Sequence, residues 1–151
     1  MQNLRPIHFK SWIDEHRHLL RPPVGNKMIW PDGEFIVMVV GGPNRRKDFH
    51  INGTPEFFYQ IEGDMTLRIR TQEGIQDIPI REGEIFLLPA GVPHSPQRNA
   101  GTVGLVVEQL RPTGMLDGLA WYCEKCGEKL YEEYFVLKSV EKDFPPVFER
   151  F

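Results

Sequence analysis

His50-Ile-Asn-Gly-Thr-Pro-Glu56, followed by Gly63, and Gly83-Glu-Ile-Phe-Leu-Leu-Pro-Ala-Gly-Val-Pro-His94 occupy the middle of this 151-residue chain. They place two histidines and one glutamate in segments punctuated by Gly and Pro. Two imidazoles and one carboxylate on one face of a metal ion leave the opposite face open, as a non-haem Fe(II) oxygenase requires for its substrate and O2. The residue types alone therefore indicate oxygen chemistry at a metal.

Short apolar or alternating segments lie between Gly- and Pro-rich turns through the central part of the chain. Regular short segments of this kind are typical of a β-sandwich or β-barrel. We therefore expect an all-β barrel over about residues 27–112. The strands that we expect lie at residues 35–40, 57–61, 65–70, 75–80, 85–88 and 103–110.

The two ends of the chain differ from this central pattern. Ser11 has the character of a helix N-cap and precedes an apolar stripe that two consecutive prolines stop, so we expect a short helix over residues 11–21. After Pro112, mixed charges and aromatic residues show no strong periodicity. We expect residues 113–151 to form a C-terminal tail that wraps the barrel or crosses to a partner subunit.

The composition is that of an ordinary globular protein and excludes several function classes. Charged residues make up 26% and hydrophobic ones 40%, and the formal net charge of -3 gives no basis for binding nucleic acid or a membrane. The segment after Met1 lacks the apolar core of a signal peptide, and no apolar run reaches membrane-spanning length. Two cysteines are not a secreted disulfide framework. We expect one cytoplasmic domain, residues 1–151.

His50, Glu56 and His94, called the triad below, each have an ordinary interpretation when taken alone. The histidines suit hydrogen-bonded turn positions, and the glutamate suits a solvated loop. An even spacing separates His50 from Glu56, but Asn-Gly-Thr-Pro breaks the strand between them, so alternation does not place both on one face. The spacing of all three as a set favours a metal site.

That spacing, His-x-Asn-x3-Glu-x6-Gly followed by Gly-x5-Pro-x-Gly-x2-His, resembles the paired motifs of the cupin superfamily. The resemblance implies a double-sheet jelly-roll barrel with a metal in its mouth. Asn52 stands where a second histidine is usual, which reduces four protein ligands to three and favours an open triad. Arg98 stands where an asparagine is usual. Because a buried arginine beside a metal requires an anion, Arg98 indicates a substrate with a carboxylate.

Four longer strings extend the resemblance: Arg46-Lys-Asp-Phe-His50, Glu56-Phe-Phe-Tyr-Gln-Ile-Glu-Gly-Asp64, Phe86-Leu-Leu-Pro-Ala-Gly-Val-Pro-His-Ser-Pro-Gln-Arg98 and Gly104-Leu-Val-Val-Glu-Gln-Leu-Arg-Pro112. Together they resemble the 3-hydroxyanthranilate 3,4-dioxygenase family, from about Ile7 to Phe151. The resemblance implies a dioxygenase with catalytic Fe2+ that opens 3-hydroxyanthranilate with O2 to give 2-amino-3-carboxymuconate semialdehyde. That reaction serves the kynurenine pathway of tryptophan degradation and quinolinate formation for NAD biosynthesis, and the sequence does not choose between the two.

The same resemblance implies a role for each matching polar residue. The triad would bind Fe2+, with Glu56 also taking part in catalysis and substrate binding. Arg98 and Glu108 would bind the substrate, and Arg46 would bind O2 near the carboxylate side, which makes both arginines catalytic. Without the resemblance, Glu108 has the character of the exposed end of an apolar strand, and its spacing from Val106 does not settle which face it uses.

Two other function classes remain open at this point. One is another metal-dependent cupin enzyme, such as a sugar isomerase or a dioxygenase of a different phenol. Such enzymes more often keep His-x-His, and nothing in them calls for Arg46 together with Arg98. The other is a non-catalytic cupin that only binds a ligand, for which the fold alone suffices.

Cys123-Glu-Lys-Cys126 has the spacing of half a tetrathiolate site for a second Fe or Zn ion. The resemblance implies a second Cys pair near the C-terminus, which this sequence lacks. Three interpretations are open: a truncated chain, ligands shared between two subunits, or a free dithiol. We favour truncation, because Pro-Pro-Val-Phe-Glu-Arg-Phe151 resembles the run that leads up to the second pair.

We also expect a homodimer. The apolar segment Phe35–Val40 and the aromatic residues of the tail exceed what one small barrel requires, and dimers are the commonest closed assembly. The aromatic residues concerned are Trp121, Tyr122, Tyr131, Tyr134 and Phe135.

Overall fold

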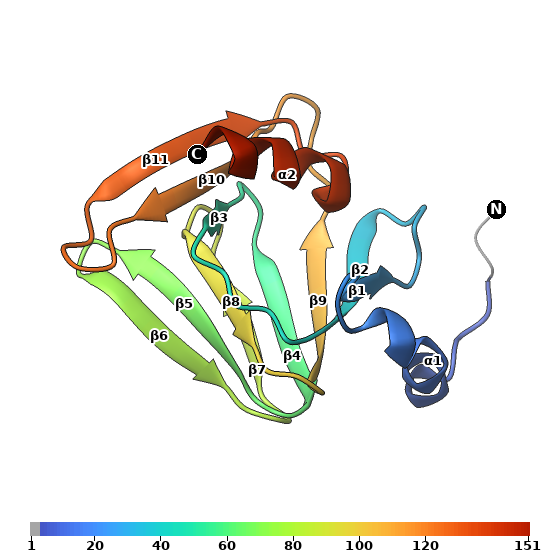
Figure 1. Cartoon of the computed structure of the whole chain (residues 1–151). Helices are drawn as coiled ribbons and strands as arrows, with labels where there is room; N and C mark the ends of the chain where they lie inside the picture. The colour runs from blue at the N-terminus through green and yellow to red at the C-terminus, as the bar shows by residue number, and fades with distance from the viewer. Residues whose placement is uncertain (1–3) are drawn as a thin grey trace.

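A computed structural model describes residues 4–151, except for the side chain of Glu141. Two antiparallel sheets face each other and splay apart toward the end where the last helix lies (Figure 1). The five-stranded sheet has the order β1 (Asn26–Met28), β2 (Phe35–Gly41), β9 (Val103–Gln109), β4 (Glu56–Glu62) and β7 (Ile85–Leu88). The six-stranded sheet has the order β11 (Lys129–Phe135), β10 (Asp117–Tyr122), β3 (Phe49–Ile51), β8 (His94–Arg98), β5 (Met65–Thr71) and β6 (Gly74–Ile80).

The prediction of an all-β double-sheet barrel is confirmed, and all six expected strands are present. Strand alternation explains the core between the sheets, since every second residue of β4 and β5 is buried. The main cluster joins Phe58 and Val106 of one sheet to Met65, Leu67 and Ile80 of the other. The resulting barrel provides a rigid wall on both sides of its interior.

Helix α1 (Phe9–His16) continues into a 3-10 turn at Arg17–Leu19. The predicted N-cap at Ser11 is wrong: His8 is the N-cap, and its ring accepts a hydrogen bond from the Ser11 amide. The helix packs Ile13 against Val39 on the outside of the five-stranded sheet. Met1–Asn3, where we expected no signal peptide, lie outside the described residues.

The C-terminal tail is more regular than its sequence indicates. Strand β10 pairs with β3, and β11 pairs with β10, so the barrel continues beyond the expected boundary at residue 112. Helix α2 (Val140–Arg150) then runs beside these strands at the open end of the barrel (Figure 1). Trp121 is buried within this chain, in a cluster with Phe144 and Val147, and therefore does not require a partner subunit.

An apolar face remains on the outside of the five-stranded sheet. Leu87, Phe57, Val107 and Val37 are neighbours across four strands. Leu87 is 62% exposed, and Ile85 beside it is 64% exposed. Among the described residues, no helix is long and apolar enough to cross a membrane.

Candidate metal centre

The triad is assembled from both sheets. His50 on β3 and His94 on β8 are direct cross-strand partners in the six-stranded sheet. Glu56, the first residue of β4, faces them from the five-stranded sheet. One ligand atom from each residue lies within 4.8 Å of the other two. Within residues 4–151, no other group of three or more His, Cys, Asp or Glu side chains converges in this way.

The turn between β3 and β4 explains why strand alternation did not relate His50 to Glu56. It carries the chain from one sheet to the other, so the two residues face each other across the interior. Gly53 permits this turn to pack closely, since a Cβ there would lie 2.9 Å from Sδ of Met115. The Gly91 amide donates to the Asn52 carbonyl at 2.8 Å and ties the turn to the segment that precedes His94.

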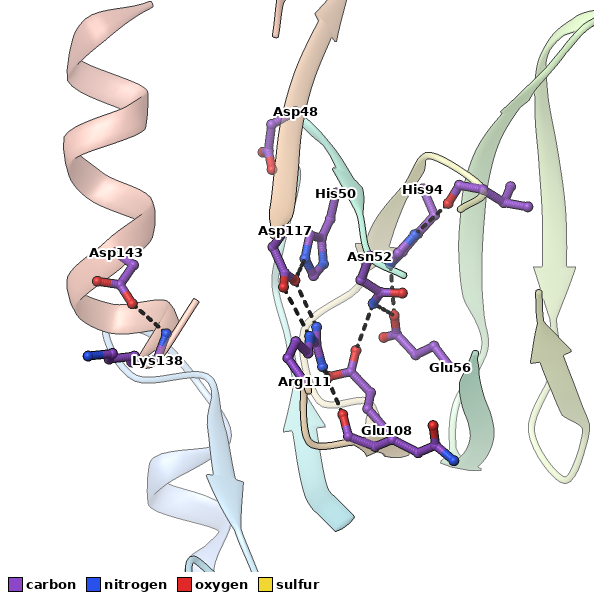
Figure 2. Close-up of polar contacts among 12 residues, drawn as sticks. Asp48, His50, Asn52, Glu56, His94, Glu108, Arg111, Asp117, Lys138 and Asp143 are labelled. Carbon is purple, nitrogen blue, oxygen red and sulfur yellow. Dashed lines mark hydrogen bonds and ion pairs between the residues drawn. The ribbon is translucent and has the colours of Figure 1, made fainter. Parts of the chain in front are cut away.

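The three triad side chains are buried, and each has a polar partner. His94 places Nε2 2.8 Å from Oε2 of Glu56, while its Nδ1 lies 3.0 Å from the Val92 carbonyl oxygen. Burial opposes ionisation of Glu56, but the charge and hydrogen bond of His94 outweigh it and lower the carboxyl pKa to about 2. Burial lowers the pKa of His50, whose Nε2 lies 2.6 Å from Oδ2 of Asp117 (Figure 2). A carboxylate and two oriented imidazoles fit a divalent transition metal.

A cavity of about 130 Å³ opens beside the triad. It brings together all the predicted site residues except the two cysteines. Apolar side chains form much of the remaining wall. The lining residues are Asn26, Met38, Val40, Asn44, Arg46, His50, Glu56, Phe58, His94, Pro96, Arg98, Val106, Glu108, Leu137, Val140 and Phe144.

Arg98 is a buried cation at the wall of this cavity. It is 2% exposed, and burial lowers the pKa of its guanidinium to about 10. Nη1 donates to Oε1 of Gln60 at 3.2 Å. Within residues 4–151, no carboxylate lies within ion-pair distance of Arg98. The charge is therefore available to an anion in the cavity.

Glu108 faces the interior, in contrast to the exposed strand end that its sequence alone indicates. It is 8% exposed and lies directly opposite Glu56 in the β4–β9 register. Burial and the charge of Glu56 raise the pKa of the Glu108 carboxyl to about 8. Asn52 donates from Nδ2 to Oε2 of Glu56 at 3.4 Å and to Oε1 of Glu108 at 3.3 Å (Figure 2). The residue that replaces the second cupin histidine thus joins two carboxylates.

Arg46 also borders the cavity, but unlike Arg98 it has a carboxylate partner. Its guanidinium forms an ion pair with Asp48 and lies 5.7 Å from the ring centroid of Phe144 on α2. Its carbonyl accepts a hydrogen bond from Nε2 of Gln97 at 2.8 Å. Arg46 is therefore held at the mouth by contacts from β8 and α2.

Sequence reasoning missed several polar residues near the triad. Asp117 contacts His50, and Arg111 contacts both Asp117 and Glu108. Asp117 lies in the tail region, where no motif marks it, and Arg111 stands in the string that ends at Pro112 but was given no role. Asn26 also borders the cavity, from a strand too short to be recognised by alternation.

Cys123 and Cys126 lie in the turn between β10 and β11. The Gly127 amide donates to the Cys123 carbonyl at 2.8 Å, and the Cys123 amide donates to the Glu128 carbonyl at 2.7 Å. Backbone amides of Cys126 and Lys125 lower the pKa of the Cys123 thiol. The two cysteines do not line the triad cavity.

The two antiparallel sheets form a barrel with the cupin fold, and the triad lies inside it. Two solved structures share this fold. Protein NMB1881 from Neisseria meningitidis matches with a TM-score of 0.52 and 22% sequence identity, over 70% of this chain and 100% of that one. A cupin-2 domain containing protein from Shewanella frigidimarina matches with a TM-score of 0.53 and 20% sequence identity, over 70% of this chain and 94% of that one. A model of the 3-hydroxyanthranilic acid dioxygenase family matches residues 1–151, and the chain belongs to this family.

Curated relatives agree with the family match. The chain is 60% identical to a 3-hydroxyanthranilate 3,4-dioxygenase from Xanthomonas euvesicatoria pv. vesicatoria over 97% of this chain and 82% of the relative. It is 53% identical to one from Jannaschia sp. over 100% of this chain and 84% of the relative.

Proposed function

We propose that this protein is a metal-dependent dioxygenase that opens the ring of 3-hydroxyanthranilate with O2, giving 2-amino-3-carboxymuconate semialdehyde. The observation that carries this proposal is the joint placement of an open triad, the buried Arg98 and the inward Glu108 around one cavity. Each part of the substrate then has a counterpart: the carboxylate faces an arginine, and the amine and hydroxyl face the metal and a carboxylate.

Fe2+ is the metal that we propose for the triad, because two histidines and one carboxylate leave adjacent positions open for substrate and O2. Bound there, it would supply the redox chemistry and hold the two reactants side by side. The donor set fits this role, since its three atoms converge and its imidazoles are oriented by Val92 and Asp117.

The protein residues would bind and orient the substrate. Arg98 would hold the carboxylate through its two-pronged guanidinium. Glu108 would accept a hydrogen bond from the substrate amine or hydroxyl. Arg46 would place positive charge on the O2 side, where negative charge develops. Apolar walls that include Phe58 and Val106 would exclude water from the reacting groups.

The test of this proposal is O2 uptake after anaerobic loading with Fe2+. We expect uptake with 3-hydroxyanthranilate, appearance of the ring-opened product by absorbance, and much weaker uptake with 2-aminophenol, which lacks the carboxylate. Equal uptake with both phenols would favour a dioxygenase of a different phenol. No uptake from the iron-loaded protein would favour a non-catalytic cupin.

We further propose a homodimer formed through the apolar face of the five-stranded sheet, with a second copy of this chain as the occupant. Light scattering of the native protein is expected to give the mass of two chains. An Ile85→Glu/Leu87→Glu variant should give one chain, because two charges would be desolvated in the interface. Leu130→Glu on β11 is the matched control, since Leu130 is 59% exposed on the other sheet. A native mass of one chain at working concentration would contradict the dimer.

Cys123 and Cys126 are proposed as two of the ligands of a second Fe or Zn site, which is incomplete in this chain and has no part in ring cleavage. A Cys123→Ser/Cys126→Ser variant is expected to keep its triad metal and its activity, because neither cysteine lines the triad cavity. Metal analysis and O2 uptake, measured on the same preparation, check this separation. Loss of ring cleavage while the triad metal is retained would contradict it.

The cytoplasm remains the proposed compartment. The basis is a thiol pair rather than a disulfide framework, which agrees with a reducing environment. Small molecules, 3-hydroxyanthranilate and O2, are the proposed partners apart from a second subunit.

A further inference from the structure

A chain of buried polar contacts joins the proposed substrate side of the cavity to a metal ligand. Nη1 of Arg111 lies 3.1 Å from Oε2 of Glu108. Nε and Nη2 of the same guanidinium lie 3.0 and 2.8 Å from the two carboxylate oxygens of Asp117. Oδ2 of Asp117 in turn lies 2.6 Å from Nε2 of His50. Figure 2 shows these contacts as one continuous path.

Arg111 lies outside the cavity, although both ends of this path, Glu108 and His50, line it. The Arg111 side chain is 7% exposed and the Asp117 side chain is fully buried. Arg111 therefore has no contact with the cavity contents and acts on them only through its two carboxylate partners.

Burial explains why these partners depend on Arg111. Buried carboxyl oxygens are costly to leave unpaired, and the Arg111 guanidinium donates to both groups. Its planar fork makes a two-pronged contact with Asp117 while a separate N–H reaches Glu108, so the directions of the two carboxylates are linked. A lysine, with one ammonium group, cannot reproduce both contacts in this geometry.

The backbone supports the same arrangement. Asp117 begins β10, and the next residues of that strand pair with β3, where Leu119 lies opposite His50. Arg111 lies two residues beyond the end of β9 and three residues after Glu108. The loop from Arg111 to Asp117 thus connects the two sheets at the level of the metal centre.

We propose that Arg111 is a positioning residue: through Asp117 it orients the His50 imidazole for the metal, and directly it orients Glu108 for the substrate. The second half rests on the proposed function, while the first concerns metal binding alone. Partners of metal-bound histidines typically contribute about 10- to 100-fold in metal affinity. Arg111 extends that effect by one further contact.

The test uses Co2+ as a spectroscopic probe of the triad, together with Arg111→Lys, Arg111→Gln and Asp117→Asn. We expect Arg111→Gln and Asp117→Asn to weaken Co2+ binding by about 10-fold or more and to shift the visible d–d absorption bands. Arg111→Lys should retain the fold, measured by thermal unfolding of the metal-free protein, yet recover the native spectrum only in part. Arg68→Gln, which breaks an exposed Arg–Asp pair with Asp77 on the β5–β6 hairpin, is the control.

Native Co2+ affinity and native absorption bands in a folded Arg111→Lys would overturn the proposal, even if Arg111→Gln failed to fold. Altered bands at an unchanged unfolding temperature would support it, since a purely structural role does not change the coordination spectrum alone. An increase in KM for 3-hydroxyanthranilate tests the Glu108 half. Because the Co2+ measurements contain no substrate, failure of the proposed activity leaves them interpretable.

Discussion

Glu56→Ala, His50→Ala and His94→Ala are each expected to abolish ring cleavage and to lose the triad metal together with it. An open three-ligand site has no spare donor, so the loss should exceed the roughly 100-fold effect of removing an outer partner. Metal content per chain and O2 uptake, measured on the same preparations, check this expectation. Circular dichroism should remain that of a β-barrel, because the core cluster around Phe58 and Leu67 does not depend on the metal.

Glu62→Ala is the matched control for Glu56→Ala. Both glutamates belong to β4, at its two ends, but Glu62 is part-exposed and pairs with Arg17 on the outside. Its loss should leave metal and activity unchanged. Full metal occupancy in any one of the three triad variants would remove that residue from the ligand set.

Arg98→Ala is expected to raise KM for 3-hydroxyanthranilate by about 10- to 150-fold, since a hydrogen bond to a charged group contributes roughly 1.5–3 kcal/mol. Arg98→Lys should recover only part of this, because an ammonium group lacks the guanidinium fork. Arg46→Ala should instead reduce kcat at least as much as it raises KM, because Arg46 would place positive charge on the O2 side, where negative charge develops. Steady-state kinetics on the three variants separate the two roles.

The carboxylate is the feature that makes the Arg98 prediction specific. Removal of Arg98 should reduce the preference for 3-hydroxyanthranilate over 2-aminophenol by the same factor by which KM rises. An Arg98→Ala enzyme with native KM would refute a carboxylate clamp at this position.

Local patterns in the sequence predicted six of the eleven strands that the structure describes. The β5 segment was recognisable from its alternation and the β7 segment from its short apolar run, each between turns that contain Gly. The helix start was misplaced because a histidine ring caps the Ser11 amide, a contact that serine-based capping rules do not anticipate. Strand β10 was missed because every residue in it is buried, which removes the alternation that marks a strand. Strand β11 was missed because its residues are only half-buried or exposed and its charged and aromatic residues do not alternate regularly.

The candidate site residues that belong to a sequence motif could be predicted. Those that only the fold brings near the triad could not. The triad matches the spacing of the cupin motifs, and Arg98 stands where those motifs usually have an asparagine. All four residues line one cavity. Glu108 required the β4–β9 register to show that it faces Glu56. Arg111 and Asp117 lie in a loop and at a strand start, where only the fold brings them to His50.

The origin of the triad residues in opposite sheets has a consequence for the order of folding. His50 and His94 become neighbours when β3 and β8 pair, but Glu56 joins them only when the five-stranded sheet closes over the other. The donor set is therefore absent from any intermediate that holds only one sheet, and the free energy of metal binding would stabilise the closed barrel. A metal ion bound by the triad would hold the two sheets together. It would stabilise the closed barrel by about 2.7 kcal/mol when the free metal concentration is 100 times the Kd.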